Sequence, residues 1–280
     1  MKLALNTSTI RGHALSVPEQ IDLTKAGGFD GVELWVKDLD RYSEQGGSLA
    51  ALADQSAAND LPVINLIGFF AWLADDERCR AEGLVEAERN FRIAAQLRCP
   101  FVAAPPFGMT EKNGPEPAIA AERFNALLAI ARKVSEEEGF VVRPLLEFWG
   151  HSQALGTLGE ALEVIEYSPE AKLLADVFHM HKKGTDHADI AHIPPQTLEV
   201  FHINDYPPCE DPANQPDAAR VFPGDGTADW DKIQRGLAGA GFEGWLSLEL
   251  FNPDYYDRPA SEVIREGFEK SRKVLTLQTS

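Results

Sequence analysis

The chain is 280 residues long, with 44% hydrophobic and 25% charged residues, which is ordinary for a folded globular protein. Its formal net charge of −18 disfavours nucleic acid and anionic membrane surfaces as partners, because both carry the same sign of charge. Three cysteines, odd in number and without a CxxC pattern, favour a reducing, cytoplasmic compartment over a disulfide framework.

Short apolar runs, often β-branched, alternate with longer amphipathic stretches along the whole chain. This pattern predicts eight strands, at 2–6, 31–36, 62–69, 101–105, 142–148, 172–177, 198–204 and 245–251. The clearest helical periodicity lies at 76–97, 118–138, 157–167, 229–240 and 260–275. The helix signal is weakest after the sixth strand, at 186–193, where we expect His187 and His192 to lie at the surface.

Strict alternation of strands and helices implies a parallel sheet with right-handed crossovers. Eight such units favour a closed (β/α)₈ TIM barrel over an open doubly wound sheet, and the chain length suits one barrel. We therefore expect residues 1–280 to form a single α/β domain. The one long loop, 206–222, is rich in Pro and Asp and follows the seventh strand on the face where such barrels carry their active sites.

Polar residues interrupt the apolar pattern at the carboxyl ends of the last four predicted strands. They are three carboxylates and one imidazole: Glu147, Asp176, His202 and Glu249. A single such residue is as often a capping or ion-paired group, but carboxylates that converge on one barrel mouth repel each other unless a cation lies between them. Oxygen and nitrogen donors without thiolate suit Mn²⁺, Mg²⁺, Co²⁺ or Zn²⁺. The pattern therefore predicts one divalent ion bound by these four side chains.

Other polar residues near the strand ends are candidates for contact with a substrate. His179 follows the sixth strand and is expected to face the mouth. Arg220 precedes a Pro-Gly turn, which predicts a side chain free to reach a substrate oxygen. His151, four residues beyond Glu147, either supports the site or faces the substrate. Glu33, at the end of the second strand, either reaches the mouth or pairs with a nearby cation, and we favour the pairing.

Several motifs resemble the sugar phosphate isomerase/epimerase superfamily, whose members are xylose isomerase-like TIM barrels. The matching stretches are LEFWGH at 146–151, DVFHMH at 176–181, FHIND at 201–205, RVFPGDG at 220–226 and SLELFNPDYY at 247–256. They are most similar to the inosose (2-keto-myo-inositol) isomerase branch. This resemblance implies a mononuclear metal centre at Glu147, Asp176, His202 and Glu249. It also implies that Glu147 and Glu249 move protons on opposite faces of the substrate.

The resemblance and the chemistry together predict a metal-dependent isomerase or epimerase of a keto-polyol, either an inosose or a ketose. A C–H bond beside a carbonyl is too weakly acidic for a carboxylate alone, and a divalent metal stabilises the enediolate that forms. One glutamate removes the proton, and the same or the opposite one returns it. The expected partners are a small carbohydrate or keto-polyol substrate and, at most, further copies of the chain in a homo-oligomer, without nucleic acid or membrane.

The sequence leaves three other functions open. A lyase or dehydratase of a 3-keto-sugar, 3-keto-glycoside or 3-dehydroshikimate type substrate would use the same metal and enolate and then eliminate a β-substituent. An endonuclease-like phosphodiesterase shares this fold but would need further metal-binding histidines and a basic surface. A non-catalytic sugar-binding subunit would not need the metal ligands.

Overall fold

The computed structural model describes residues 2–109 and 114–276. Eight parallel strands pair in chain order, and the last pairs with the first, so that the sheet closes into a barrel. The strands are β1 (Lys2–Asn6), β2 (Gly31–Trp35), β3 (Val63–Ile67), β4 (Phe101–Ala104), β5 (Arg143–Glu147), β6 (Lys172–Asp176), β7 (Leu198–Ile203) and β8 (Trp245–Leu248). The predicted α/β class and TIM barrel fold are confirmed, and each predicted strand is present with its ends shifted by a few residues at most.

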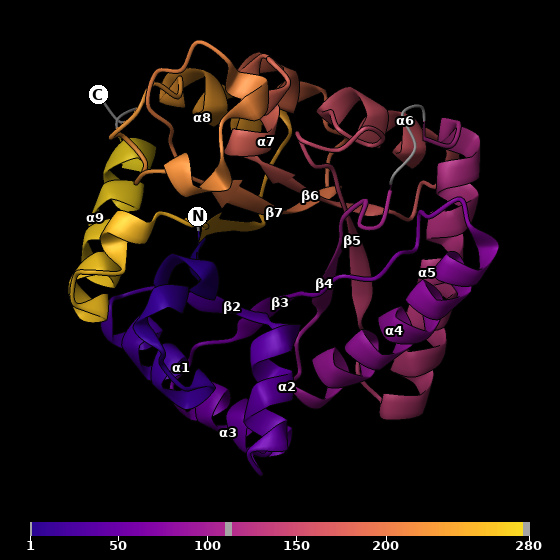
Figure 1. Cartoon of the computed structure of the whole chain (residues 1–280), viewed down its shortest axis with the longest axis horizontal. Helices are drawn as coiled ribbons and strands as arrows, with labels where there is room; N and C mark the ends of the chain where they lie inside the picture. Colours follow the sequence, from indigo (N-terminus) through magenta and orange to yellow (C-terminus); the bar gives the residue numbers. More distant parts are fainter. Residues whose placement is uncertain (1, 110–113, 277–280) are drawn as a thin grey trace.

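Helices surround the barrel (Figure 1). They are α1 (Val17–Ala26), α2 (Val36–Glu44), α3 (Leu49–Ala58), α4 (Glu77–Gln96), α5 (Pro117–Glu138), α6 (Leu158–Tyr167), α7 (Val177–Lys182), α8 (Trp230–Gly239) and α9 (Ala260–Thr276). Short 3-10 helices are η1 (Thr7–His13), η2 (His187–His192), η3 (Pro212–Asn214), η4 (Asp217–Ala219) and η5 (Pro253–Tyr255). The last helix, α9 (yellow), packs beside α1 (indigo), so the first and last parts of the barrel meet. Within the described ranges, no helix combines the length and the apolar character needed to cross a membrane.

Local signals in the sequence explain where several helices begin and end. Thr157 and Glu160 form a capping box at the start of α6, and Gly139 ends α5 with a φ of 70°. Helix α7 begins directly after β6, because the Asp176 carboxylate accepts hydrogen bonds from the backbone N–H groups of Phe178 and His179. The periodicity did not single out α7, since six residues are too few to display a helical repeat.

The segment after α7 is less exposed than the sequence predicted. It forms η2, which packs against α8 at Gly236, where an added Cβ would lie only 2.7 Å from the Ile190 Cβ. His187 is consequently buried, with 7% of its surface exposed, so its predicted surface position is wrong. His192, at the other end of η2, has a side chain that is 73% exposed, as predicted.

Side-chain alternation along the strands divides the barrel interior into two layers. Small and aliphatic side chains form the deeper layer: Ala4, Ile64, Ala103, Leu145, Leu174 and Val200. Two residues further along four of these strands come buried polar side chains, which are Asn6, Glu147, Asp176 and His202. Residues two apart on a strand share one face of the sheet, so both sets point inward. The apolar layer closes the barrel, and the polar layer forms the floor of its mouth.

The long loop after β7 is held at its base by one buried carboxylate. Asp205 and Val221 exchange both backbone hydrogen bonds, which closes the loop. The Asp205 carboxylate also accepts hydrogen bonds from three backbone N–H groups of this segment and from the Trp230 indole. These contacts fix the part of the loop that carries Arg220.

Replacing Gly226 with alanine should destabilise this loop. A Cβ at this position would overlap Asp205 Oδ1 and the Tyr206 carbonyl oxygen, and only a backbone shift can relieve the second overlap. We expect Gly226→Ala to lower the free energy of unfolding, measured by urea titration, by about 1–3 kcal/mol. Gly159→Ala is the matched control and should not lower it, because only Thr157 Oγ1 comes within 4 Å of its Cβ. An unchanged free energy for Gly226→Ala would contradict this account of the loop.

Candidate metal centre and substrate pocket

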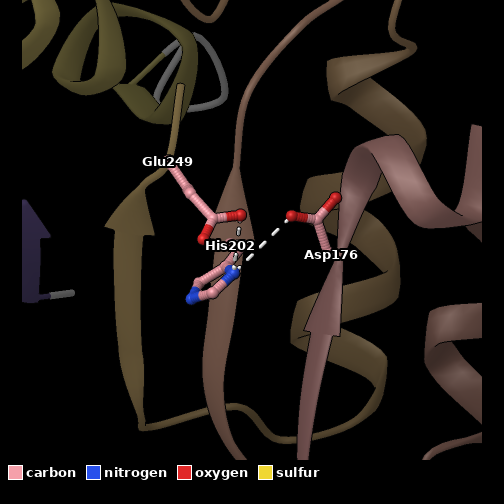
Figure 2. A group of neighbouring side chains, drawn as sticks. All are labelled: Asp176, His202 and Glu249. Atoms are coloured by element: carbon pink, nitrogen blue, oxygen red, sulfur yellow. Dashed lines mark ion pairs between the residues drawn. The ribbon is translucent and has the colours of Figure 1, made fainter. Parts of the chain in front are cut away.

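Three side chains at the ends of neighbouring strands converge at the barrel mouth (Figure 2). Asp176 ends β6, His202 lies in β7, and Glu249 follows β8. His202 Nδ1 is 3.2 Å from Glu249 Oε2 and 3.6 Å from Asp176 Oδ2, and one donor atom of each residue lies within 4.8 Å of the others. All three side chains are buried. The structure thus brings together three of the four residues that the sequence singled out as metal ligands.

The His202 ring is oriented by a third buried carboxylate, on the side opposite Asp176 and Glu249. Its Nε2 lies 2.9 Å from Glu33 Oε2, and a carboxylate can only accept, so Nε2 donates. Nδ1 is left facing Asp176 and Glu249, buried and without a hydrogen-bond partner. Burial alone would lower the pKa of His202, but the charges of Glu249 and Glu33 raise it well above its ordinary value. Positive charge at Nδ1, carried by a proton or a metal ion, is therefore favoured.

Glu33 is the centre of a buried hydrogen-bond network inside the barrel. It accepts from the side chains of Asn6, Asn65 and Ser247 as well as from His202. Burial would raise the pKa of Glu33, but the charge of His202 and these hydrogen bonds lower it. The favoured interpretation of Glu33, pairing with a nearby cation, agrees with this geometry. What the sequence did not reveal is that the partner is a candidate metal ligand.

These donors fit a divalent cation. Two carboxylates and an imidazole nitrogen are common ligands of Zn²⁺ and Mn²⁺. An imidazole whose second nitrogen donates to a carboxylate is also the arrangement that orients metal-binding histidines in general. The unpartnered Nδ1 of His202, aimed at two carboxylates, is the atom that such an ion would satisfy.

Glu147 lies in the same pocket as Glu249 but outside the group of three. It ends β5, is buried, and accepts a hydrogen bond from the Trp149 indole at 3.0 Å. Burial is the main cause that raises the pKa of Glu147 to about 8; the charge of Glu249 adds to this effect and that of His202 opposes it. In most molecules at neutral pH and without a metal ion, the Glu147 carboxyl group is therefore protonated.

Arg220 is buried and paired, so the prediction of a free side chain is wrong. Its Nη1 lies 2.8 Å from Asp176 Oδ2 and 2.7 Å from Glu249 Oε2, and its Nη2 lies 3.0 Å from Asp217 Oδ1. Burial would lower the pKa of Arg220, but these three carboxylates raise it. Only Nε lacks a partner. The sequence did not single out Asp217, because only the closure of the long loop brings it to the pocket.

A cavity of about 330 Å³ opens beside these residues, within the range of small-molecule sites. Its polar lining is Arg11, Glu147, His151, His179, Asp217, Arg220 and Glu249, and its aromatic lining is Trp35, Phe69, Trp149 and Phe251. All three residues predicted to contact a substrate therefore border the cavity. Burial lowers the pKa of His179 to about 3, so its ring is neutral, and its Nδ1 is buried without a partner. Unpartnered polar atoms at a cavity wall suit a ligand rich in oxygen.

Comparison with known proteins identifies one family model and several proteins of similar sequence or structure. A family model described as xylose isomerase-like TIM barrel matches residues 21–274. An inosose isomerase of Halalkalibacterium halodurans is 26% identical over 100% of both chains. A 3-dehydroshikimate dehydratase of Pseudomonas aeruginosa is 27% identical over 100% of this chain and 44% of its own length. The crystal structure of the IOLI protein with a zinc atom has a TM-score of 0.87 at 24% identity, covering 99% of this chain and 98% of that one.

Removing the charge of Glu33 should weaken metal binding, although Glu33 itself does not face the ion. In Glu33→Gln an amide N–H group would face side chains that now donate to the carboxylate, so the His202 ring loses its fixed orientation. We expect the dissociation constant for Zn²⁺, measured by competition with a chromophoric chelator, to rise about 10–100-fold. Glu44→Gln removes the same charge at an exposed position and should have no effect. Equal affinity in Glu33→Gln and the unmodified protein would refute the orienting role.

Metal affinity should also depend on pH, because a proton and a metal ion compete for His202 Nδ1. The raised pKa of His202 keeps the proton in place at neutral pH. Raising the pH removes it, so the apparent affinity should increase with pH until the raised pKa is passed. The logarithm of the affinity should rise by about one per pH unit for each proton released. Calorimetric titration with Zn²⁺ in buffers of different ionisation enthalpy counts the protons, and a count of zero would exclude His202 as a ligand.

Proposed function

We propose that this chain, which belongs to the xylose isomerase-like TIM barrel family, is a divalent-metal-dependent isomerase or epimerase of a keto-polyol, such as an inosose or a ketose. The observation that carries the proposal is the buried group of Asp176, His202 and Glu249, with the His202 ring held by Glu33. Similarity to an inosose isomerase along the whole length of both chains supports the substrate class. The zinc atom in the IOLI structure supports a divalent ion.

We assign the ion to Asp176, His202 and Glu249, with Glu147 as the fourth ligand that the motif resemblance implies. When bound, the ion supplies positive charge that stabilises the negative charge of an enediolate. The same charge would offset the repulsion between carboxylates that Arg220 now reduces through its contacts with Asp176 and Glu249.

Glu147 and Glu249 both line the pocket, and we assign them the proton transfers. One takes the proton from the carbon beside the carbonyl, and the electron pair of the broken C–H bond forms the C=C bond of the enediolate. For epimerisation, the other returns a proton to the same carbon from the opposite face. For isomerisation, the proton goes to the neighbouring carbon, and a hydroxyl proton moves to the former carbonyl oxygen. Without the ion, burial raises the pKa of Glu147 to about 8, and the positive charge of a bound ion would lower it, which favours the carboxylate that accepts a proton.

Arg220 and His179 are assigned to hold the substrate through its oxygens. Arg220 Nε and His179 Nδ1 are buried and lack partners, and both residues border the cavity. A hydroxyl or carbonyl oxygen placed against them would remove the cost of leaving buried polar atoms unpaired. Trp35, Phe69 and Phe251 would cover the C–H faces of a polyol and exclude water from the reacting carbon.

A lyase or dehydratase is the second candidate, favoured by the 27% identity to a 3-dehydroshikimate dehydratase over the whole of this chain. It would share the removal of a proton beside a carbonyl. The electron pair would then expel a β-hydroxyl group or the aglycone oxygen of a glycosidic bond, which takes up a proton and leaves as water or as an alcohol. The product would be a conjugated enone. The two candidates therefore differ in the fate of the enediolate, while the residues that form it are the same.

A reaction in D₂O tests the proposal. With keto-inositols, ketohexoses and 3-keto-glycosides as candidate substrates and Mn²⁺ added, we expect an isomerised or epimerised ketone that carries deuterium, detected by NMR. Glu147→Gln and Glu249→Gln should each lower the rate by about 10²–10⁴-fold, because an amide cannot act as a base at neutral pH.

Glu136→Gln, on the exposed surface of α5, removes the same charge and should keep the full rate. Circular dichroism should show that the two pocket variants remain folded. An absorbing enone or a released aglycone without any isomerised ketone would reject the isomerase in favour of the lyase. Full activity of both pocket variants would reject the assignment of the proton transfers.

A further inference from the structure

One arginine at the pocket wall has no role in the proposed function. Arg11 lies in η1, directly after β1, and lines the cavity. Its guanidinium carbon lies 4.3 Å from the centroid of the Trp35 ring and 5.2 Å from that of the Phe251 ring. The two aromatic faces attract the cation and displace part of its water, while the side chain as a whole remains exposed.

Arg11 differs from the other arginine of the pocket in lacking an anionic partner. Across residues 2–109 and 114–276, no carboxylate lies within ion-pair distance of the Arg11 guanidinium, and no oxygen accepts a hydrogen bond from this side chain. Arg220, by contrast, contacts three carboxylates. The chain has 44 acidic and 26 basic residues, so carboxylates are in excess. A guanidinium at the wall of a cavity that no carboxylate of the described residues neutralises is available to a ligand.

The Phe251 ring connects the two arginines. Its centroid lies 5.2 Å from the guanidinium carbon of Arg11 and 5.1 Å from that of Arg220, and both arginines line the same cavity, so one ligand there can contact both. Arg220 contacts the carboxylates of the candidate metal centre, whereas Arg11 lies over the aromatic part of the lining. A ligand whose carbonyl lies at the metal centre would therefore extend its other end toward Arg11.

We propose that the substrate is an acid, a keto-polyol whose end remote from the reacting carbonyl is a carboxylate that Arg11 binds. This inference rests on the proposed function and narrows its substrate class. A planar guanidinium donates two parallel N–H bonds to a carboxylate, and apolar neighbours strengthen the attraction. A protein with a net charge of −18 otherwise repels an acid, so its pocket needs a cation of this kind to admit one.

Three six-carbon probes that differ at the far terminus test this inference. D-fructose, D-fructuronate and D-fructose 6-phosphate carry a hydroxymethyl group, a carboxylate and a phosphate ester at that end. We expect Zn²⁺-loaded protein to bind D-fructuronate about 10-fold more tightly than D-fructose, or better, in isothermal titration calorimetry. Arg11→Gln should abolish the difference and leave the affinity for D-fructose unchanged. Arg11→Lys keeps the positive charge but lacks the planar guanidinium, so it should retain part of the preference for D-fructuronate over D-fructose.

Arg265→Gln is the matched control: it removes the same charge from the exposed surface of α9 and should keep the full preference for the acid. Equal binding of the acid and the ketose by the unmodified protein would overturn the inference, as would loss of both ligands in Arg11→Gln. Tighter binding of the phosphate ester than of the acid would overturn the carboxylate assignment.

These measurements need no turnover, so the two proposals fail separately. Acid-selective binding that depends on Arg11, without proton exchange on any ketone, would leave this inference standing and refute the proposed function. Proton exchange on neutral ketoses without acid selectivity would refute this inference and leave the proposed function standing.

Discussion

The mouth of this barrel depends on one buried contact, the hydrogen bond between Glu33 and His202. A carboxylate inside a barrel loses its hydration and is stable only when donors and positive charge replace the water. Glu33 obtains them from Asn6, Asn65 and Ser247 and from the His202 ring. Because these donors come from β1, β3, β8 and β7, the contact requires the barrel to be closed. In return it fixes the one imidazole nitrogen that faces the candidate metal site.

The alternation of side chains explains why the fold and the strand-end donors could be predicted from sequence. The strands are mostly apolar because they are buried on both faces, so a charged residue or a histidine near the carboxyl end of a strand stands out. Asp176 and His202 were recognisable in this way, and so was Glu147, although it lies outside the group of three. The capping box at Thr157 and the left-handed Gly139 are equally local signals, which is why the ends of α6 and α5 were also predictable.

The rest of the site depends on contacts between residues far apart in the chain. Glu33 and His202 are 169 residues apart, and no local pattern reveals that one orients the other. Arg220 sits in a Pro-Gly segment that is typical of exposed turns, yet the fold buries it against Asp176 and Glu249. His187 looked like a surface residue because η2 is short and polar, but a glycine of α8 allows the two helices close approach. In each case tertiary packing overrides a local preference.

The pocket is lined by residues at the strand ends and by residues on the segments that follow the strands, and the two sets have different parts in the proposed reaction. The donors that would hold a metal ion and move protons come from β5 to β8, which are common to isomerisation and to elimination. Both reactions begin by removing a proton beside a carbonyl, so these residues cannot distinguish them. In the proposed function, discrimination would come from the groups assigned to the remaining substrate oxygens, and these residues lie on η1, on α7 and on the loop after β7. Under the proposed function, segments outside the barrel strands would therefore determine the choice of substrate, whereas the strand ends would determine which chemistry is available to the chain.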